Sequence, residues 1–198
     1  MRRRRTLIES PLDWGLAAPV RHPLLPVVAE RGGTQIRTPR ATAIIDTREQ
    51  EPFCFSRFSR WFESIEHRAL PLGDYSVAGM EDSCVVERKN LSDLIQSFTS
   101  GREVFIARLR RMSEVPNRLL VITAALSEVK SRYAHSPADP NRITQSLIAT
   151  LVGLQVPFLC AETHQLGAEI TASYLYQVHL HHWLDSNGYG RCLSDTDL

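Results

Sequence analysis

Lysine is scarce in this 198-residue sequence: arginine supplies 21 of the 23 basic residues, and only Lys89 and Lys130 are lysines. The net charge is +1, which by itself gives no indication of a nucleic-acid partner. No run of eighteen apolar residues occurs, so a membrane-spanning helix and a membrane partner are excluded on length. The four cysteines form no CxxC pair, and three lie in apolar contexts typical of reduced thiols, which favours a reducing cytoplasm over a secreted disulfide scaffold.

Charge is unevenly distributed along the chain. Residues 1–40 contain eight arginines against three acidic residues, a net charge of +5, whereas the remainder has 15 basic and 19 acidic residues, a net charge of −4. Five of the eleven prolines also lie in residues 1–40, where they block long helices. We therefore expect a basic, extended or partly disordered arm at 1–40, a globular domain at 41–185 and a short tail at 186–198.

The globular part is rich enough in apolar residues, at 43% of the chain, to build a core. Helical spacing of apolar residues predicts helices from Pro52 to about Ile65 and over 92–98, 102–113, 126–133, 141–155 and 167–184. Short apolar runs predict strands at 43–45, 118–123 and 156–161, and a β-hairpin with arms 67–77 and 83–89. This order of elements predicts an α/β sandwich with a mixed sheet.

The hairpin brings two carboxylates together. If its turn is centred between Met80 and Glu81, the numbers of facing residues add up to 161, so Asp74 faces Glu87. Directly opposed residues have Cβ atoms about 5 Å apart, and a register error of one residue would place the two on opposite faces. Lys89 is two residues from Glu87 and therefore shares its face of the strand.

Two opposed carboxylates repel each other unless a positive charge lies between them. Lys89 is one candidate, and a divalent cation with a preference for hard oxygen ligands, Mg²⁺ or Mn²⁺, is the other. Asp46, at the end of an adjacent strand, could supply a third carboxylate. The alternative is a solvated strand face with a modest ion pair, although the apolar neighbours of Asp74 and Glu87 make charges there costly without a function.

Three segments carrying these residues resemble a known family. IIDTREQEPF, LPLGDYSV and VVERKNLSDL, followed by Ser100-Gly101-Arg102, are similar to the nuclease domain of the xeroderma pigmentosum group F (XPF) type endonucleases, with their GDxn(V/I)ERKxxxD motif. The resemblance covers residues 42–165. It implies the fold of the PD-(D/E)XK nucleases, a restriction-endonuclease-like three-layer sandwich with a central mixed β-sheet flanked by helices.

The resemblance also implies roles for individual residues. Asp74 and Glu87 would bind Mg²⁺ or Mn²⁺ together with the backbone carbonyl of Arg88, and Lys89 would orient the attacking water. Asp46 would belong to the same acidic cluster, and Asp93 would complete the ERKxxxD motif. Phosphate contacts would come from Arg48, and the planar fork of Arg48 and Arg88 matches phosphate oxygens. Apart from the resemblance, Arg102, Arg108 and Arg111 share the polar side of the helix at 102–113 and could either track a DNA backbone or form a solvated helix face.

We therefore expect a metal-dependent DNA endonuclease that cleaves branched, flap or otherwise structured DNA in repair or recombination, in the cytoplasm and at the nucleoid if the source is prokaryotic. The alternative is a catalytically silent DNA-binding or scaffold module of the same fold. The resemblance implies a homodimer through the nuclease domain. The sequence contains no tandem helix-hairpin-helix or helicase segment, so we expect a separate DNA-binding or helicase partner to select the junction.

Overall fold

The computed structural model describes residues 27–29 and 35–189. Residues 27–37 include a short antiparallel pair, β1 (Val27–Ala29) and β2 (Gln35–Arg37), so this part of the expected arm is extended. The rest of the predicted arm, at 1–26 and 30–34, and residues 190–198 of the predicted tail lie outside the described residues. Within the described part, no helix combines the length and apolar character that crossing a membrane requires.

A mixed six-stranded sheet forms the centre of the domain, in the order β4-β3-β5-β6-β7-β8. β3 pairs parallel with β4 and antiparallel with β5, β5 pairs antiparallel with β6, and β6, β7 and β8 are parallel. The strands are β3 (Ala41–Ile45), β4 (Phe62–His67), β5 (Tyr75–Val77), β6 (Cys84–Lys89), β7 (Asn117–Ile122) and β8 (Phe158–Cys160).

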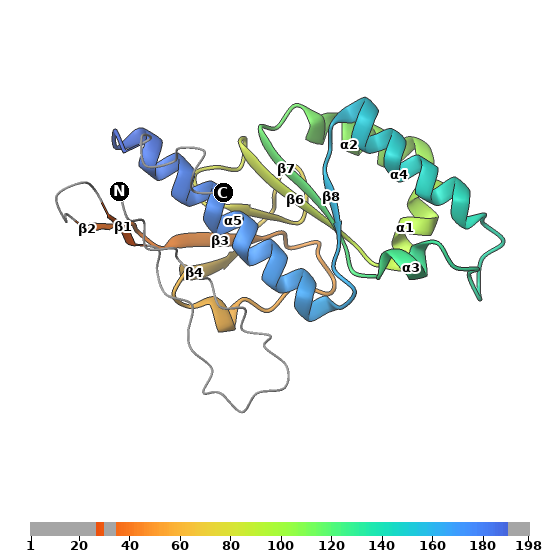
Figure 1. Cartoon of the computed structure of the whole chain (residues 1–198), viewed down its shortest axis with the longest axis horizontal. Helices are drawn as coiled ribbons and strands as arrows, with labels where there is room; N and C mark the ends of the chain where they lie inside the picture. Colours follow the sequence, from red (N-terminus) through yellow and green to blue (C-terminus); the bar gives the residue numbers. More distant parts are fainter. Residues whose placement is uncertain (1–26, 30–34, 190–198) are drawn as a thin grey trace.

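Successive side chains of β6 and β7 point to opposite faces of the sheet and enter different hydrophobic clusters. Both faces of the sheet are therefore buried at these strands. Val86, Leu119 and Val121 pack toward α5 (His164–Ser186), which lies across one face of the sheet (Figure 1). Val85, Leu120 and Ile122 pack toward the helices on the opposite face, α1 (Leu91–Phe98), α2 (Arg102–Ser113), α3 (Leu126–Val129) and α4 (Pro140–Leu154). The predicted three-layer α/β sandwich with a central mixed sheet is therefore confirmed.

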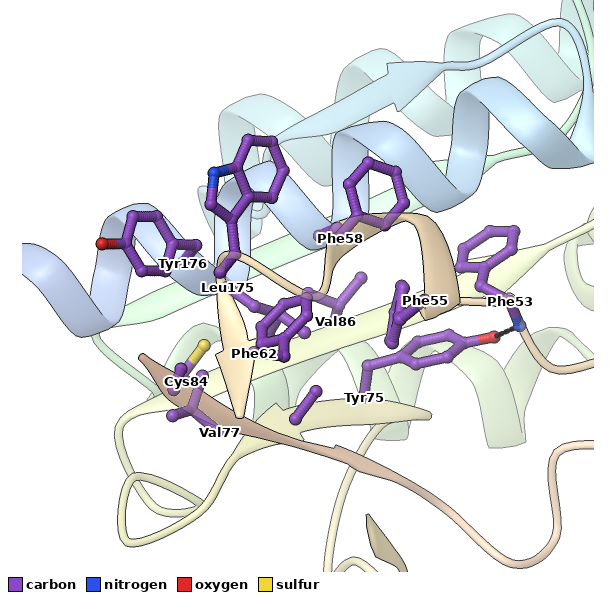
Figure 2. Packing of buried hydrophobic residues seen from close by; sticks show 14 of the residues in the cluster. Phe53, Phe55, Phe58, Phe62, Tyr75, Val77, Cys84, Val86, Leu175 and Tyr176 are labelled. Atoms are coloured by element: carbon purple, nitrogen blue, oxygen red, sulfur yellow. Dashed lines mark hydrogen bonds between the residues drawn. The ribbon is translucent and has the colours of Figure 1, made fainter. Parts of the chain in front are cut away.

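The cluster under α5 is rich in aromatic side chains (Figure 2). Trp61 stacks on Tyr176 of α5 with ring centroids 5.8 Å apart, and Phe53 stacks on Tyr75 at 5.1 Å. The Phe53 N–H donates a hydrogen bond of 3.0 Å to the Tyr75 hydroxyl, which is buried. Because Tyr75 directly follows Asp74, this core anchors the start of β5 and the segment that follows β3.

The helix predicted from Pro52 to Ile65 is wrong. The segment forms one short 3-10 turn, η1 (Ser56–Phe58), and then β4, which pairs with β3. The apolar residues that suggested a helix are divided between the aromatic core and an edge strand on which only Phe62 is buried. Long-range pairing with β3 therefore overrides the local periodicity.

The first arm of the predicted hairpin is also too long. Only Tyr75–Val77 forms a strand, while the residues from Arg68 to Asp74 form a loop. Pro71 has no N–H to donate to a ladder, and Gly73 has a φ of +74°, which is incompatible with a strand. The helix predicted over 126–133 ends at Val129, half its predicted length. The other predicted strands and helices are present with small differences in their ends, and α2 has the predicted bounds.

Candidate active site

The ends of three neighbouring strands meet at one end of the sheet. Asp46 directly follows β3, Asp74 directly precedes β5, and Lys89 is the last residue of β6. Because β5 is antiparallel to both neighbours, its start lies beside the ends of β3 and β6. A cavity of about 470 Å³ opens here, and its polar lining includes Asp46, Arg48, Glu49, Asp74, Lys89, Asn90, Asp93, Arg108 and Arg111.

The predicted hairpin register holds at the one pair that the structure gives between β5 and β6. Tyr75 pairs with Val86, and these numbers also add up to 161, while Asp74 lies in the loop just before β5. The Asp74 N–H donates to the Val86 carbonyl at 2.8 Å, and Asp74 Oδ2 accepts from the Arg88 N–H at 2.7 Å, so Asp74 is bonded to both residues that flank Glu87. Burial, and next the neighbouring charge of Glu87, raise the pKa of Asp74.

Glu87 is completely buried and is held by two cations. Arg108 of α2 donates from Nη1 to Oε1 and Oε2 of Glu87, at 2.7 and 3.0 Å. Lys89 Nζ lies 3.1 Å from Oε1 and 5.4 Å from the centre of the Phe105 ring, which also belongs to α2. The charge of Glu87 in turn raises the pKa of Arg108. Arg108, which we expected to contact DNA, is thus part of the carboxylate site in this structure.

Asp46 is not joined to the other two carboxylates. Its Oδ1 accepts from N and Nε of Arg48, and its Oδ2 accepts from Nη2 of Arg48 and from the N–H of Leu70, at 2.7–2.8 Å. These bonds from Arg48 hold the pKa of Asp46 at about 2. Arg48 also donates from Nη2 to the Leu70 carbonyl, so the pair fixes the loop that leads to Asp74.

Arg88 lines the same cavity but its side chain is paired with Glu49. Its guanidinium bonds to Glu49 at 2.9 Å, with 5% and 7% of the two side chains exposed, and lies over the Phe53 ring. An arginine buried in this way supports the segment after β3 and is poorly placed to contact phosphate. Glu49 is a contributor that the sequence reasoning missed, because its partner lies 39 residues away and no local pattern marks the pair.

Of the remaining predicted residues, Asp93 and Arg111 line the cavity and Arg102 does not. Asp93 lies in the first turn of α1, where the Asn90 side chain caps its N–H at 2.8 Å, and both residues line the cavity. Arg111 lines the cavity and donates to the Pro71 carbonyl at 3.0 Å. Arg102 bonds to Ser146 of α4 and is absent from the cavity lining, so the three helix arginines do not form one DNA-facing row.

The donors around Asp74 fit a hard divalent cation. The Val86 carbonyl faces β5, while that of Ser83 accepts from Asn117 of β7 and that of Lys89 from Thr123, directly after β7. Because carbonyl directions alternate along a strand, the Arg88 carbonyl lies on the β5 side, next to Asp74. Two carboxylates and a carbonyl suit Mg²⁺ or Mn²⁺. Among the described residues, however, no group of three or more His, Cys, Asp or Glu could hold a metal, so Asp46 does not complete the expected cluster.

The mixed six-stranded sheet with helices on both faces defines the chain as an α/β protein of three layers. The sequence model of one family, described as the ERCC4 domain, matches residues 45–174, which is well over half of the chain. The chain therefore belongs to the ERCC4 domain family. A search of curated proteins returned no match.

Solved structures show the same fold. XPF from Aeropyrum pernix aligns with a TM-score of 0.55 and 18% identity, over 69% of this chain and 61% of that one. XPF from Aeropyrum pernix in complex with DNA aligns with the same TM-score and identity, over 72% of this chain and 66% of that one. The chain thus spans under two thirds of the length of these structures.

Proposed function

We propose that this protein is a DNA endonuclease that hydrolyses phosphodiester bonds with Mg²⁺ or Mn²⁺ and acts on branched, flap or otherwise structured DNA in repair or recombination. The observation that carries the proposal is Asp74, bonded to the backbone on both sides of the buried Glu87, with Lys89 paired to Glu87 and with Asp74 and Lys89 lining a cavity that opens to solvent. Membership in the ERCC4 domain family supports it, as does the likeness to a structure that is described as a complex with DNA.

In this mechanism Asp74, Glu87 and the Arg88 carbonyl would hold the metal, which when bound would supply a lower pKa for a bound water and positive charge against the phosphate. Lys89 is 18% exposed, which lets its ammonium group orient the attacking water or donate to a phosphoryl oxygen while it remains paired with Glu87.

Arginines provide the positive surface for DNA. Arg48 is 67% exposed while its guanidinium is held by Asp46, so it offers a positioned charge at the cavity. Arg111 lies on the α2 wall of the same cavity. Phosphate contacts of this kind position a DNA backbone and carry no sequence preference, which suits an enzyme that recognises structure.

The test is a cleavage assay with fluorescent flap, fork, single-stranded and duplex DNA, each with Mg²⁺, Mn²⁺ or EDTA. Wild-type protein cleaves at least the flap or fork substrate with metal and not with EDTA. The Asp74→Ala and Lys89→Ala variants lose cleavage and keep DNA binding. If wild-type protein binds DNA and cuts none of the substrates with either metal, the catalytically silent scaffold is the better description.

A homodimer through the nuclease domain and a separate DNA-binding or helicase partner remain part of the proposal. The closing helix α5 buries eight residues against the sheet, which leaves only its outer side for a second subunit. Light scattering on the purified chain distinguishes a dimer from a monomer. Added DNA-binding partners are then tested by the change in substrate preference that they cause.

A further inference from the structure

Arg108 and Glu87 make a contact at the cavity to which the proposed function gives no role. Both oxygens of Glu87 accept from the same Nη1 atom of Arg108, at 2.7 and 3.0 Å, although Lys89 already lies 3.1 Å from one of them. A completely buried carboxylate thus faces two positive charges. Such charge-assisted bonds are among the stronger hydrogen bonds in proteins, so this pairing is a real competitor for any other ligand of Glu87.

The exposure of the two cations suggests which one can leave. Arg108 is 42% exposed and reaches Glu87 from α2, whereas Lys89 is 18% exposed and belongs to the same strand as Glu87. A long side chain that is half in solvent can turn away at little cost in hydration. Arg111, one turn further along α2, instead donates to the Pro71 carbonyl and contacts neither carboxylate in this structure.

The charge balance of the site explains why Arg108 would leave Glu87 when a divalent cation binds. Glu87 and Asp74 contribute two negative charges, and Lys89 and Arg108 two positive ones. A divalent cation added to all four would leave an excess of two positive charges in a largely buried site, which is costly. Release of Arg108 to the cavity mouth removes one of these charges and frees Oε2 of Glu87, while Lys89 stays paired with Oε1.

We infer that Arg108 competes with a divalent cation for Glu87: it holds the carboxylate in the cation-free protein and releases it on cation binding. This inference rests on the proposed function of the site. Competition multiplies the intrinsic metal affinity by the fraction of molecules in which Glu87 is free, so a small free fraction gives a weak apparent affinity. The released guanidinium lies in the cavity that Arg48 also lines, so it becomes available to a DNA phosphate, and cation and DNA binding are coupled through Arg108.

The test measures Mn²⁺ binding without DNA by isothermal titration calorimetry, for wild-type protein, Arg108→Gln and Arg111→Gln. The second variant is the matched control, because it removes the same charge from the same helix and leaves Glu87 paired. Arg108→Gln binds Mn²⁺ about tenfold more tightly than wild type, and Arg111→Gln stays within about twofold. As a second readout, Mn²⁺ raises the Tm of Arg108→Gln more than that of wild type, with circular dichroism confirming that both are folded.

The outcomes separate this inference from the proposed function. Equal or weaker Mn²⁺ binding by Arg108→Gln, relative to wild type, overturns the competition even if wild-type protein cleaves DNA. Tighter binding by Arg108→Gln together with no cleavage by wild type supports the competition and contradicts the nuclease. If no protein binds Mn²⁺ and none cleaves DNA, both are contradicted.

Discussion

The carboxylate of Asp74 accepts a hydrogen bond from the backbone N–H of Arg88, at 2.7 Å. The Asp74 N–H donates to the Val86 carbonyl, so the residue is fixed on both sides of Glu87 by backbone atoms of β6. Two like charges are thus held together by the geometry of the sheet and not by side-chain packing alone. This arrangement depends on the loop before β5, which Arg48 holds, and on the segment after β3, which Arg88 holds through Glu49.

Gly73 is essential to the position of Asp74. A Cβ atom at Gly73 would lie 2.2 Å from Val85 Cγ2 and 2.9 Å from the Val86 carbonyl oxygen, and the φ of +74° disfavours any other residue. We expect Gly73→Ala to lower the free energy of unfolding by about 3 kcal/mol and to abolish cleavage. Gly79→Ala is the control, because Gly79 has a φ of +79° with nothing within 4 Å, and it should cost only about 1 kcal/mol. Urea unfolding measures both, and equal losses would contradict this account.

The buried ion pair between Arg88 and Glu49 supports the wall of the cavity. Glu49→Ala leaves the Arg88 guanidinium without its main partner, and we expect a loss of about 3 kcal/mol in the free energy of unfolding. The double variant Glu49→Ala/Arg88→Met removes both charges and should be more stable than Glu49→Ala alone. Chemical denaturation of the two variants checks the order. A double variant less stable than the single one would show that the pair does more than neutralise charge.

We expect Asp46 to position the loop before β5 and not to bind a metal. Asp46→Asn weakens the bonds to Arg48 and Leu70, and we expect the free energy of unfolding to fall by about 1–2 kcal/mol. Its Mn²⁺ affinity should stay within about threefold of wild type, whereas Asp74→Asn should reduce it more than about tenfold. Calorimetric titration of the two variants distinguishes a positioning residue from a ligand. Equal losses of affinity would restore Asp46 to the metal cluster.

Arg48 and Arg102 should differ in their effect on DNA binding. Arg48 is exposed at the cavity, so Arg48→Gln removes one phosphate contact and should reduce the slope of log K against log salt concentration by about one. Arg102 is bonded to Ser146 outside the cavity lining, and Arg102→Gln should leave the slope unchanged. Fluorescence anisotropy at several salt concentrations gives both slopes, and a lower slope for Arg102→Gln would extend the DNA surface toward α4.

The parts of the site that the sequence predicts are local. A hairpin turn determines which residues face each other, so the pairing of Tyr75 with Val86, next to Asp74 and Glu87, follows from the position of the turn near Met80. The edge strand β4 was not predictable in this way, because its side chains are mostly exposed and its pairing with β3 is long-range. Arg108 and Glu87 lie 21 residues apart and have no shared pattern, so their contact requires the packing of α2 on the sheet.

The most direct test of the central claim is the single-turnover cleavage rate of flap DNA by wild-type protein and by Asp74→Asn, with Mg²⁺ and with EDTA, at protein concentrations that saturate DNA binding. This substitution keeps the size of the side chain and removes its charge. We expect cleavage by wild type with Mg²⁺ only, and a rate at least about a thousandfold lower for Asp74→Asn at unchanged DNA affinity. Cleavage by wild type in EDTA, or an undiminished rate for Asp74→Asn, would contradict the proposed mechanism.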